Sequence, residues 1–130
     1  MDREKGVRGQ SLAEFAIVAS LLILIMLGVF DLGRVFYSYV VITNAAREGA
    51  YYGGMQPDDH PGIIAHVRME AQGSGVALED TDVYYIYPDP PTGSGVPKIV
   101  CVQYRFSLLT SFLPGGREIH LKSCAQMVTY

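Results

Sequence analysis

One apolar run near the N-terminus constrains this chain more than any other feature. Residues 15–30 read FAIVASLLILIMLGVF and contain no charged side chain. As a helix, these sixteen residues span about 24 Å, slightly less than the hydrocarbon core of a bilayer. Apolar residues lie on every side of that helix, so we expect lipid or other helices around it and not a surface-lying orientation. The sequence therefore predicts one membrane-spanning helix.

The remaining sequence has the composition of a small domain. The chain has 130 residues, of which 49% are hydrophobic, and outside residues 12–30 the hydrophobic share falls to an ordinary soluble value. Its net charge of −3 argues against a surface that binds nucleic acid. The single apolar run excludes a multispan membrane protein and disfavours a freely soluble enzyme.

The flanks of the run set its orientation. The first nine residues, MDREKGVRG, carry three basic side chains, and basic residues beside a first span keep that end in the cytoplasm. The sequence after the run, Asp31-Leu32-Gly33-Arg34, offers no small-residue cleavage site of the secretory type. A proline-free sequence continues to Tyr52, so we expect one helix from about Ser11 to Tyr52, roughly 63 Å long. Its second half projects outward and needs a cover for its apolar stripe.

Glu14 is a carboxylate at the entry to the apolar run. An unpaired carboxylate costs about 2.5 to 3.5 kcal/mol near mid-membrane and less at the edge. One interpretation places Glu14 in the headgroup zone. The other gives it a partner: if the chain is cut after Gly9, the new amine on Gln10 of a neighbouring subunit can pair with this carboxylate inside a helical bundle.

The sequence here resembles a known family. Gly9-Gln10-Ser11-Leu12-Ala13-Glu14-Phe15, followed by the apolar run, is similar to the prepilin class III signal. Together with residues 32–50, LGRVFYSYVVITNAAREGA, it resembles a TadE-like minor pilin or pseudopilin of the tight-adherence (Flp/Tad) type IV pilus systems. The resemblance implies a leader over residues 1–9, a hydrophobic transmembrane and filament-core helix over 10–34, and an outward-facing pilin-like domain over 35–130.

The same resemblance implies partners and a location. A prepilin peptidase is expected to cut between Gly9 and Gln10, and Gln10, Glu14 and Phe15 are the implied assembly residues. Expected partners are the membrane, an inner-membrane pilus assembly platform and other pilin subunits, with the filament outside the cell. A principal filament subunit and an unpolymerised single-span binding protein that keeps residues 1–9 are the alternatives. The mature chain would begin with Gln10 and not with the phenylalanine of many type IV pilins, which leaves N-methylation open.

The outward part has an α+β pattern. Gly53-Gly54 and the following Pro57 are expected to end the long helix, and Pro61 to begin a short one that stops near Gly73. Three strand-like segments follow, at 82–87, 98–108 and 118–129. We therefore expect a small antiparallel sheet of about three strands and a short helix packed on the C-terminal half of the long helix, a type IV pilin-like arrangement.

The last two strands constrain each other. The apolar residues have even numbers in the first strand and odd numbers in the second. If both apolar faces lie on the same side of an antiparallel hairpin, the numbers of two paired residues must add up to an odd value. A value of 225 places Tyr104 opposite Leu121 and Cys101 opposite Cys124. The cysteines then lie on the face away from the helix, within disulfide reach in an oxidising compartment. Registers of 223 or 227 fit the apolar pattern nearly as well and separate them.

No catalytic pattern emerges from the remaining polar residues. The two cysteines lack a histidine at zinc-ligand spacing, and the three histidines are scattered, so we expect no enzyme, metal or cofactor. Asp31 and Arg34 follow the apolar run at a spacing of three. They are either an ordinary pair on one helix or an ion pair between subunits, and so they join the assembly candidates.

Overall fold

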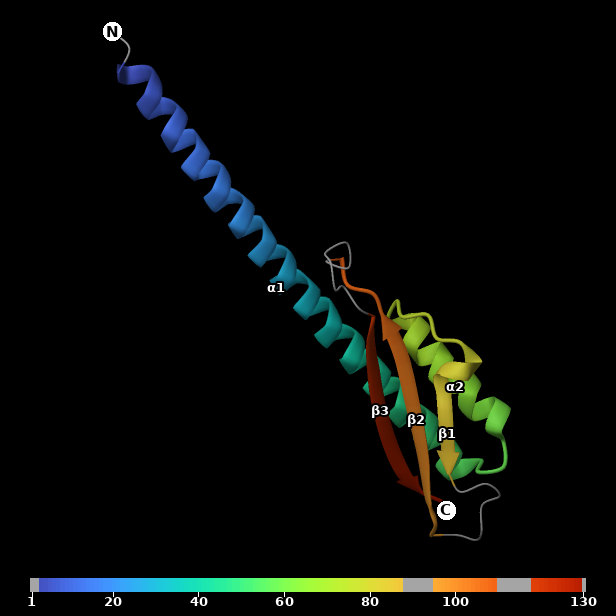
Figure 1. Ribbon diagram of the computed structural model, residues 1–130. Helices are drawn as coiled ribbons and strands as arrows, with labels where there is room; N and C mark the ends of the chain where they lie inside the picture. Colours follow the sequence, from blue (N-terminus) through green and yellow to red (C-terminus); the bar gives the residue numbers. More distant parts are fainter. Residues whose placement is uncertain (1–2, 88–94, 110–117, 130) are drawn as a thin grey trace.

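The protein consists of a long helix with a small α+β domain on its C-terminal half (Figure 1). The computed structural model describes residues 3–87, 95–109 and 118–129. Its elements are α1 (Arg3–Met55), α2 (His60–Gly73), the short 3-10 helix η1 (Asp80–Asp82), β1 (Val83–Tyr87), β2 (Pro97–Phe106) and β3 (Ile119–Val128). The strands form an antiparallel sheet in the order β1-β2-β3. The expected α+β fold class is confirmed.

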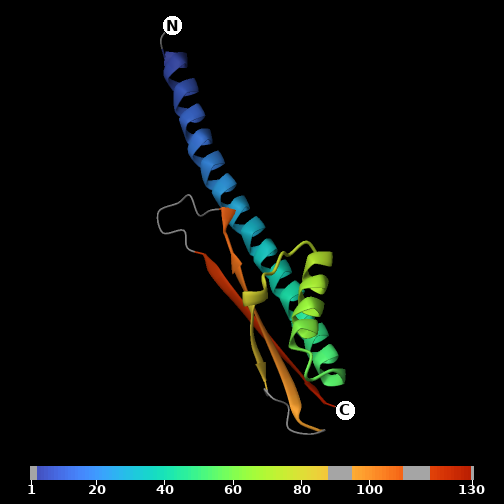
Figure 2. The same cartoon turned by 90° about the vertical axis from the view of Figure 1, so that its right-hand side faces the viewer.

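The core surrounds the C-terminal half of α1. Alanines at 45, 46 and 50, with Val41 and Ile42, are buried and let neighbouring elements approach the helix closely. On one side α2 contributes Ile63 and Val67, and on the other the sheet contributes valines from β2. In Figure 2, α1 lies between α2 and the sheet. The apolar stripe of the projecting half is thus covered from two sides, as its pattern requires.

The end of α1 differs from the prediction. The sequence pattern ended the helix at Gly53-Gly54, but both glycines are helical, buried and inside α1. A methyl group on Gly53 would lie 3.0 Å from Ile63 and 3.1 Å from Lys98, and one on Gly54 would lie 3.0 Å from Met127. These glycines therefore serve close packing of α2, β2 and β3 against α1. The helix ends at Met55, two residues before Pro57.

The start of α1 also differs. We expected the helix from about Ser11, but it begins at Arg3. The segment before Ser11 contains Glu4, Lys5 and Arg8, which are good helix formers, and no proline. Residues 3–10 are therefore continuous with the apolar helix.

The hairpin register is the one that adds up to 225. Tyr104 pairs with Leu121, Phe106 with Ile119, and Cys101 with Cys124. The inward positions of β2, such as Val100 and Val102, are buried against α1. On β3 the inward Ser123 hydroxyl lies 3.0 Å from the Thr43 hydroxyl of α1. The alternation of apolar residues thus predicted the odd parity of the pairing correctly, since a slip by one residue reverses a strand's faces. The structure has register 225 and not 223 or 227.

Candidate assembly surface

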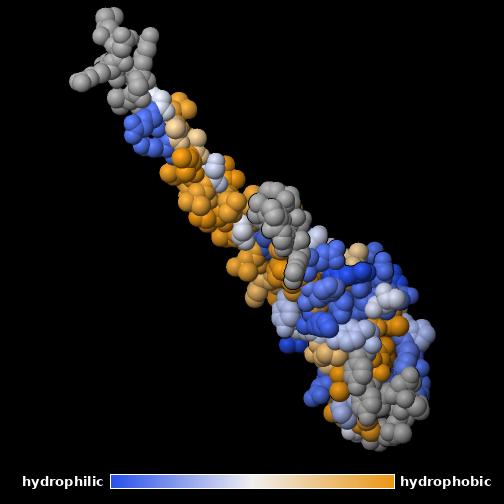
Figure 3. Space-filling view, viewed as in Figure 1, coloured by the Kyte–Doolittle hydropathy of each residue, from blue (hydrophilic) through white to orange (hydrophobic). Residues whose placement is uncertain are grey.

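The N-terminal half of α1 has no cover within the chain. No residue from 9 to 30 is buried, and Phe15 and Met26 are 72% and 75% exposed. Figure 3 shows hydrophobic residues over most of this projecting rod. Among the described residues, α1 is the one helix long and apolar enough to cross a membrane. Such a surface requires lipid or other helices around it.

Glu14 has a polar neighbour one turn away. The Gln10 side-chain amide donates a hydrogen bond of 3.1 Å to the Glu14 carboxylate, and both residues are exposed. Gly9, Gln10, Glu14 and Phe15 all lie on the uncovered part of α1. The geometry therefore places these four predicted residues on one accessible helix end, and their processing and assembly roles stay predictions.

Asp31 and Arg34 meet within the chain where the uncovered helix enters the domain. Arg34 Nη1 donates to Asp31 Oδ1 at 3.3 Å, and the Asp31 side chain is only 4% exposed. The backbone N–H of Leu109, which follows β2, donates to the same oxygen at 3.0 Å. The Arg34 guanidinium also lies 4.9 Å from the centre of the Phe106 ring. In this single chain the pair fastens the sheet to α1, and a contact between subunits stays a prediction.

The two cysteines form a disulfide in the structure. Cys101 of β2 is bonded to Cys124 of β3, at a sequence separation of 23. Cys101 is buried and Cys124 is exposed, on the face of the sheet opposite the inward Val100 and Ser123. The bond ties the two long strands together across the sheet.

A second polar cluster joins α1 to α2. The Tyr52 hydroxyl donates to Asp59 Oδ2 at 2.7 Å, and Asp59 Oδ1 accepts from the Gly62 N–H at 3.0 Å, which caps α2. These two bonds, the Tyr52 bond first, hold the pKa of Asp59 below its ordinary value. The hydrogen bond to Asp59 raises the pKa of Tyr52 in turn. The Tyr52 ring stacks on His66, with ring centres 4.1 Å apart.

Lys98 is a buried charged residue that the sequence analysis did not single out. It occupies an inward position of β2 and is fully buried. Its Nζ donates to the Pro57 carbonyl oxygen at 2.9 Å and lies 3.4 Å from His60 Nε2. The ammonium group therefore lies beyond the C-terminus of α1, where a positive charge is favoured by the helix dipole. Lys98 is at an even position of the strand, like the inward-facing Val100 and Val102, and this was the available signal. Its contact with the turn after α1 could not be predicted from the sequence.

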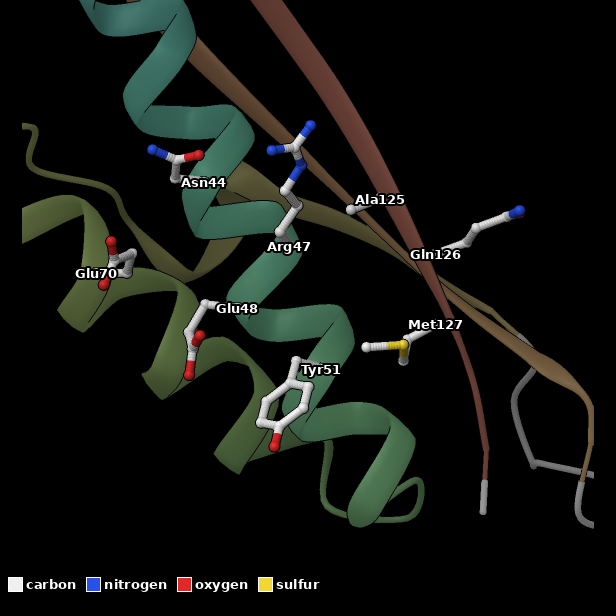
Figure 4. A pocket seen from close by; sticks show the side chains of 8 residues that line it. All are labelled: Asn44, Arg47, Glu48, Tyr51, Glu70, Ala125, Gln126 and Met127. Atoms are coloured by element: carbon white, nitrogen blue, oxygen red, sulfur yellow. The ribbon is translucent and has the colours of Figure 1, made fainter.

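The domain also carries a groove of about 550 Å³ beside the buried part of α1 (Figure 4). Arg47 lies on its β3 side and Glu48 on its α2 side, and Tyr51 follows one turn further along α1. Glu48 lies 4.0 Å from His66 of α2. The lining combines one cation with carboxylates and holds no arrangement of nucleophile and base. Within residues 3–87, 95–109 and 118–129, no group of three or more His, Cys, Asp or Glu side chains is placed to hold a metal ion.

Comparison with known families bears on this helix directly. A family model described as TadE-like protein matches residues 9–50. Residues 9–50 are TadE-like. The comparisons with curated proteins and with solved structures found no match.

The TadE-like segment includes both halves of α1. It begins at Gly9, runs through the uncovered residues 15–30 and ends at Ala50, inside the domain core. This match confirms, over residues 9–50, the resemblance predicted from the sequence. The uncovered half of the TadE-like segment is compatible with anchoring by a single membrane span.

Proposed function

We propose that this chain is a structural subunit that is cut after Gly9 by a prepilin peptidase and then assembled into a Tad-type pilus, or primes its assembly, for surface attachment. The observation that carries the proposal is the uncovered helix over residues 9–30, all of which lies within the TadE-like match. Before assembly, lipid surrounds this helix and its N-terminus faces the cytoplasm. After assembly, helices of neighbouring subunits replace the lipid.

Helix packing supplies the driving force for that exchange. Lipid tails are as apolar as the side chains of residues 15–30, so the transfer is favoured by van der Waals contact and polar pairing more than by the hydrophobic effect. A polar pair in this setting contributes about 0.6 to 2 kcal/mol. Glu14 is the acidic residue at the start of the apolar helix. It therefore favours a neighbouring helix that presents a polar partner to its carboxylate.

Cleavage changes the partner available to Glu14. In the uncut chain its carboxylate accepts a hydrogen bond from the Gln10 side-chain amide. Cutting after Gly9 gives Gln10 a charged amine, and a charged donor bonds a carboxylate about twice as strongly as a neutral one. We propose that Glu14 pairs with the Gln10 amine of a neighbouring subunit and so fixes the register between helices.

Asp31 and Arg34 lie at the other end of the uncovered helix. Their contacts with Leu109 and Phe106 hold the domain at the end of the apolar run. The domain therefore stays outside while the helix is exchanged from lipid to filament. The Arg34 side chain is 39% exposed, which leaves it accessible to a neighbouring subunit.

The decisive variant is Glu14→Ala, compared with Glu70→Ala on α2 as the matched control. Glu70 is an exposed carboxylate of the domain, far from the uncovered helix. We expect both variants to reach the membrane fraction at the wild-type level and Glu14→Ala alone to be depleted from sheared filaments. A loss of about 1.4 kcal/mol in pairing corresponds to a tenfold drop in association. Unchanged filament content in Glu14→Ala would refute the assembly role.

A second variant tests processing. Gly9 has open space around the position of a side chain, so Gly9→Leu leaves the helix intact. We expect this variant to keep residues 1–9 because the bulky side chain hinders the peptidase at the cut. Gly28→Leu, also in open space on the same helix, is the control and is expected to be cut normally. Normal trimming of Gly9→Leu, seen by N-terminal sequencing, would contradict the proposed site.

A further inference from the structure

A groove of about 540 Å³ lies at the membrane-facing end of the domain. One wall is α1, from Val29 to Ser38, and the opposite wall is the end of β2, with Tyr104 and Phe106. The loop after α2 closes it at Gly75 and Val76, and the Tyr37 hydroxyl donates to the Ser74 carbonyl oxygen at 3.0 Å. A groove of this size is within the range that binds small molecules.

The polarity of the α1 wall changes in order along the helix. Phe30, Arg34 and Tyr37 follow one another at helical spacing and therefore share one face. Arg34 lies about 6 Å and Tyr37 about 10 Å beyond Phe30 along the axis. The groove thus runs from apolar, through a cation, to a phenol hydroxyl. A phospholipid has the same order, with acyl chain, phosphate and polar headgroup.

The groove also lies at the matching depth. Phe30 is the last residue of the apolar run and is 61% exposed. The headgroup layer adds about 5 to 7 Å on each side of the hydrocarbon core. If the run fills the core, Arg34 lies in the phosphate layer and Tyr37 at its outer edge. Aromatic and basic residues are favoured at this level of a membrane protein.

Charge and stacking prepare Arg34 for a phosphate. Its guanidinium has five N–H donors in a planar fork, and its contact with Asp31 is made through Nη1. The Phe106 ring beneath it holds the plane of the fork in position. The Asp31 carboxylate is turned into the protein, where the Leu109 N–H binds it.

We infer that this groove binds a phospholipid of the outer leaflet while the subunit is still anchored in the membrane. Arg34 holds the phosphate, Phe30 and Val29 contact the acyl chain, and Tyr104 lies beside the headgroup. The lipid would hold the domain against the membrane surface until assembly. The inference rests on the membrane-anchored stage of the proposed function and adds a ligand to it.

The absence of tryptophan from the chain makes the test direct. Three single-tryptophan reporters of the full chain are compared in phosphatidylcholine vesicles brominated either near the headgroup or near the middle of the acyl chains. Tyr104→Trp reports on the groove, Leu24→Trp on the middle of the apolar run, and Tyr51→Trp on the far end of α1. We expect shallow bromine to quench Tyr104→Trp, deep bromine to quench Leu24→Trp, and neither to quench Tyr51→Trp.

A variant that fills the groove distinguishes quenching by a lipid bound in the groove from quenching that arises only because the domain lies near the bilayer. Gly33 lines the groove, and a methyl group at this position would meet nothing within 4 Å, so the larger leucine side chain has room there. Adding Gly33→Leu to each reporter should abolish most quenching of Tyr104→Trp and leave Leu24→Trp unchanged. Persistent quenching of Tyr104→Trp in the filled groove would overturn the inference.

The remaining outcomes keep the two proposals apart. Quenched Leu24→Trp with unquenched Tyr104→Trp overturns the lipid site and leaves the membrane anchor standing. Unquenched Leu24→Trp overturns both, because the chain is then not inserted. Quenching of Tyr104→Trp that appears only on dilution of the protein in lipid identifies a second copy as the main occupant and also overturns the inference.

Discussion

Substitution of Gly49 by alanine tests the packing of the domain on α1. Gly49 is buried at the point where α1 faces both α2 and β2. A methyl group there would overlap Val67 Cγ2 and lie 3.3 Å from Val100 Cγ1, closer than the roughly 3.5 to 4.0 Å of ordinary carbon contacts. Overpacking a core costs about 1 to 3 kcal/mol, and alanine returns up to about 1 kcal/mol of helix propensity. With the full gain in helix propensity, we expect Gly49→Ala to lower the free energy of unfolding by up to about 2 kcal/mol.

Gly33→Ala is the matched control on the same helix. Nothing lies within 4 Å of a methyl group at Gly33, so only the gain in helix propensity remains. Urea unfolding of the full chain in detergent micelles, followed by the near-ultraviolet circular dichroism of its nine tyrosines, compares the two variants. Gly33→Ala should be as stable as the wild type or more so. A Gly49→Ala protein that matches Gly33→Ala would refute the packing argument.

Three further predictions concern bonds within the domain. Reducing the Cys101–Cys124 disulfide should lower the free energy of unfolding by about 3 kcal/mol in the chain-entropy model, and equal urea midpoints with and without reductant would contradict its structural role. The pKa of Asp59 is lowered in the folded protein, so its stabilising contribution is present above the ordinary value of 3.8 and is lost as the pH falls through the lower folded pKa. Tyr52→Phe removes the hydrogen bond that is the first cause of this lowered pKa. The free energy of unfolding of this variant should therefore fall less steeply than that of the wild type as the pH is lowered. An equally steep fall in both proteins would exclude the hydrogen bond as the cause of the shift. Lys98→Met keeps an unbranched side chain in the core, and the lost hydrogen bond to the Pro57 carbonyl should lower the free energy of unfolding by about 1 to 3 kcal/mol. Lys98→Ala also leaves a cavity and should lower it more. Equal thermal stability of the two variants would contradict this view.

Periodicity and alternation were sufficient to predict the overall fold. The apolar run, the three-residue and four-residue steps after it and the parity of the last two strands depend on local patterns that burial enforces. Among the three possible registers, the structure has the one that pairs Cys101 with Cys124. Glycine misled the prediction at Gly53 and Gly54, because the same residue that ends helices also permits close helix packing.

The candidate site was predictable only where the residues are close in sequence. Gln10 with Glu14, and Asp31 with Arg34, are one helical turn apart and were found from spacing. The contact of Leu109 with Asp31 joins residues 78 positions apart, and no local pattern reveals it. The same holds for Lys98 at the turn after α1, since a lysine in a strand ordinarily signals an exposed position.

The intact mass of the chain, recovered from both membranes and sheared filaments, tests the proposed function most directly. Processing between Gly9 and Gln10 predicts that both fractions contain a chain beginning at Gln10, with residues 1–9 absent. A chain that retains residues 1–9 and is found only in the membrane fraction would contradict the account and identify an unpolymerised anchored protein.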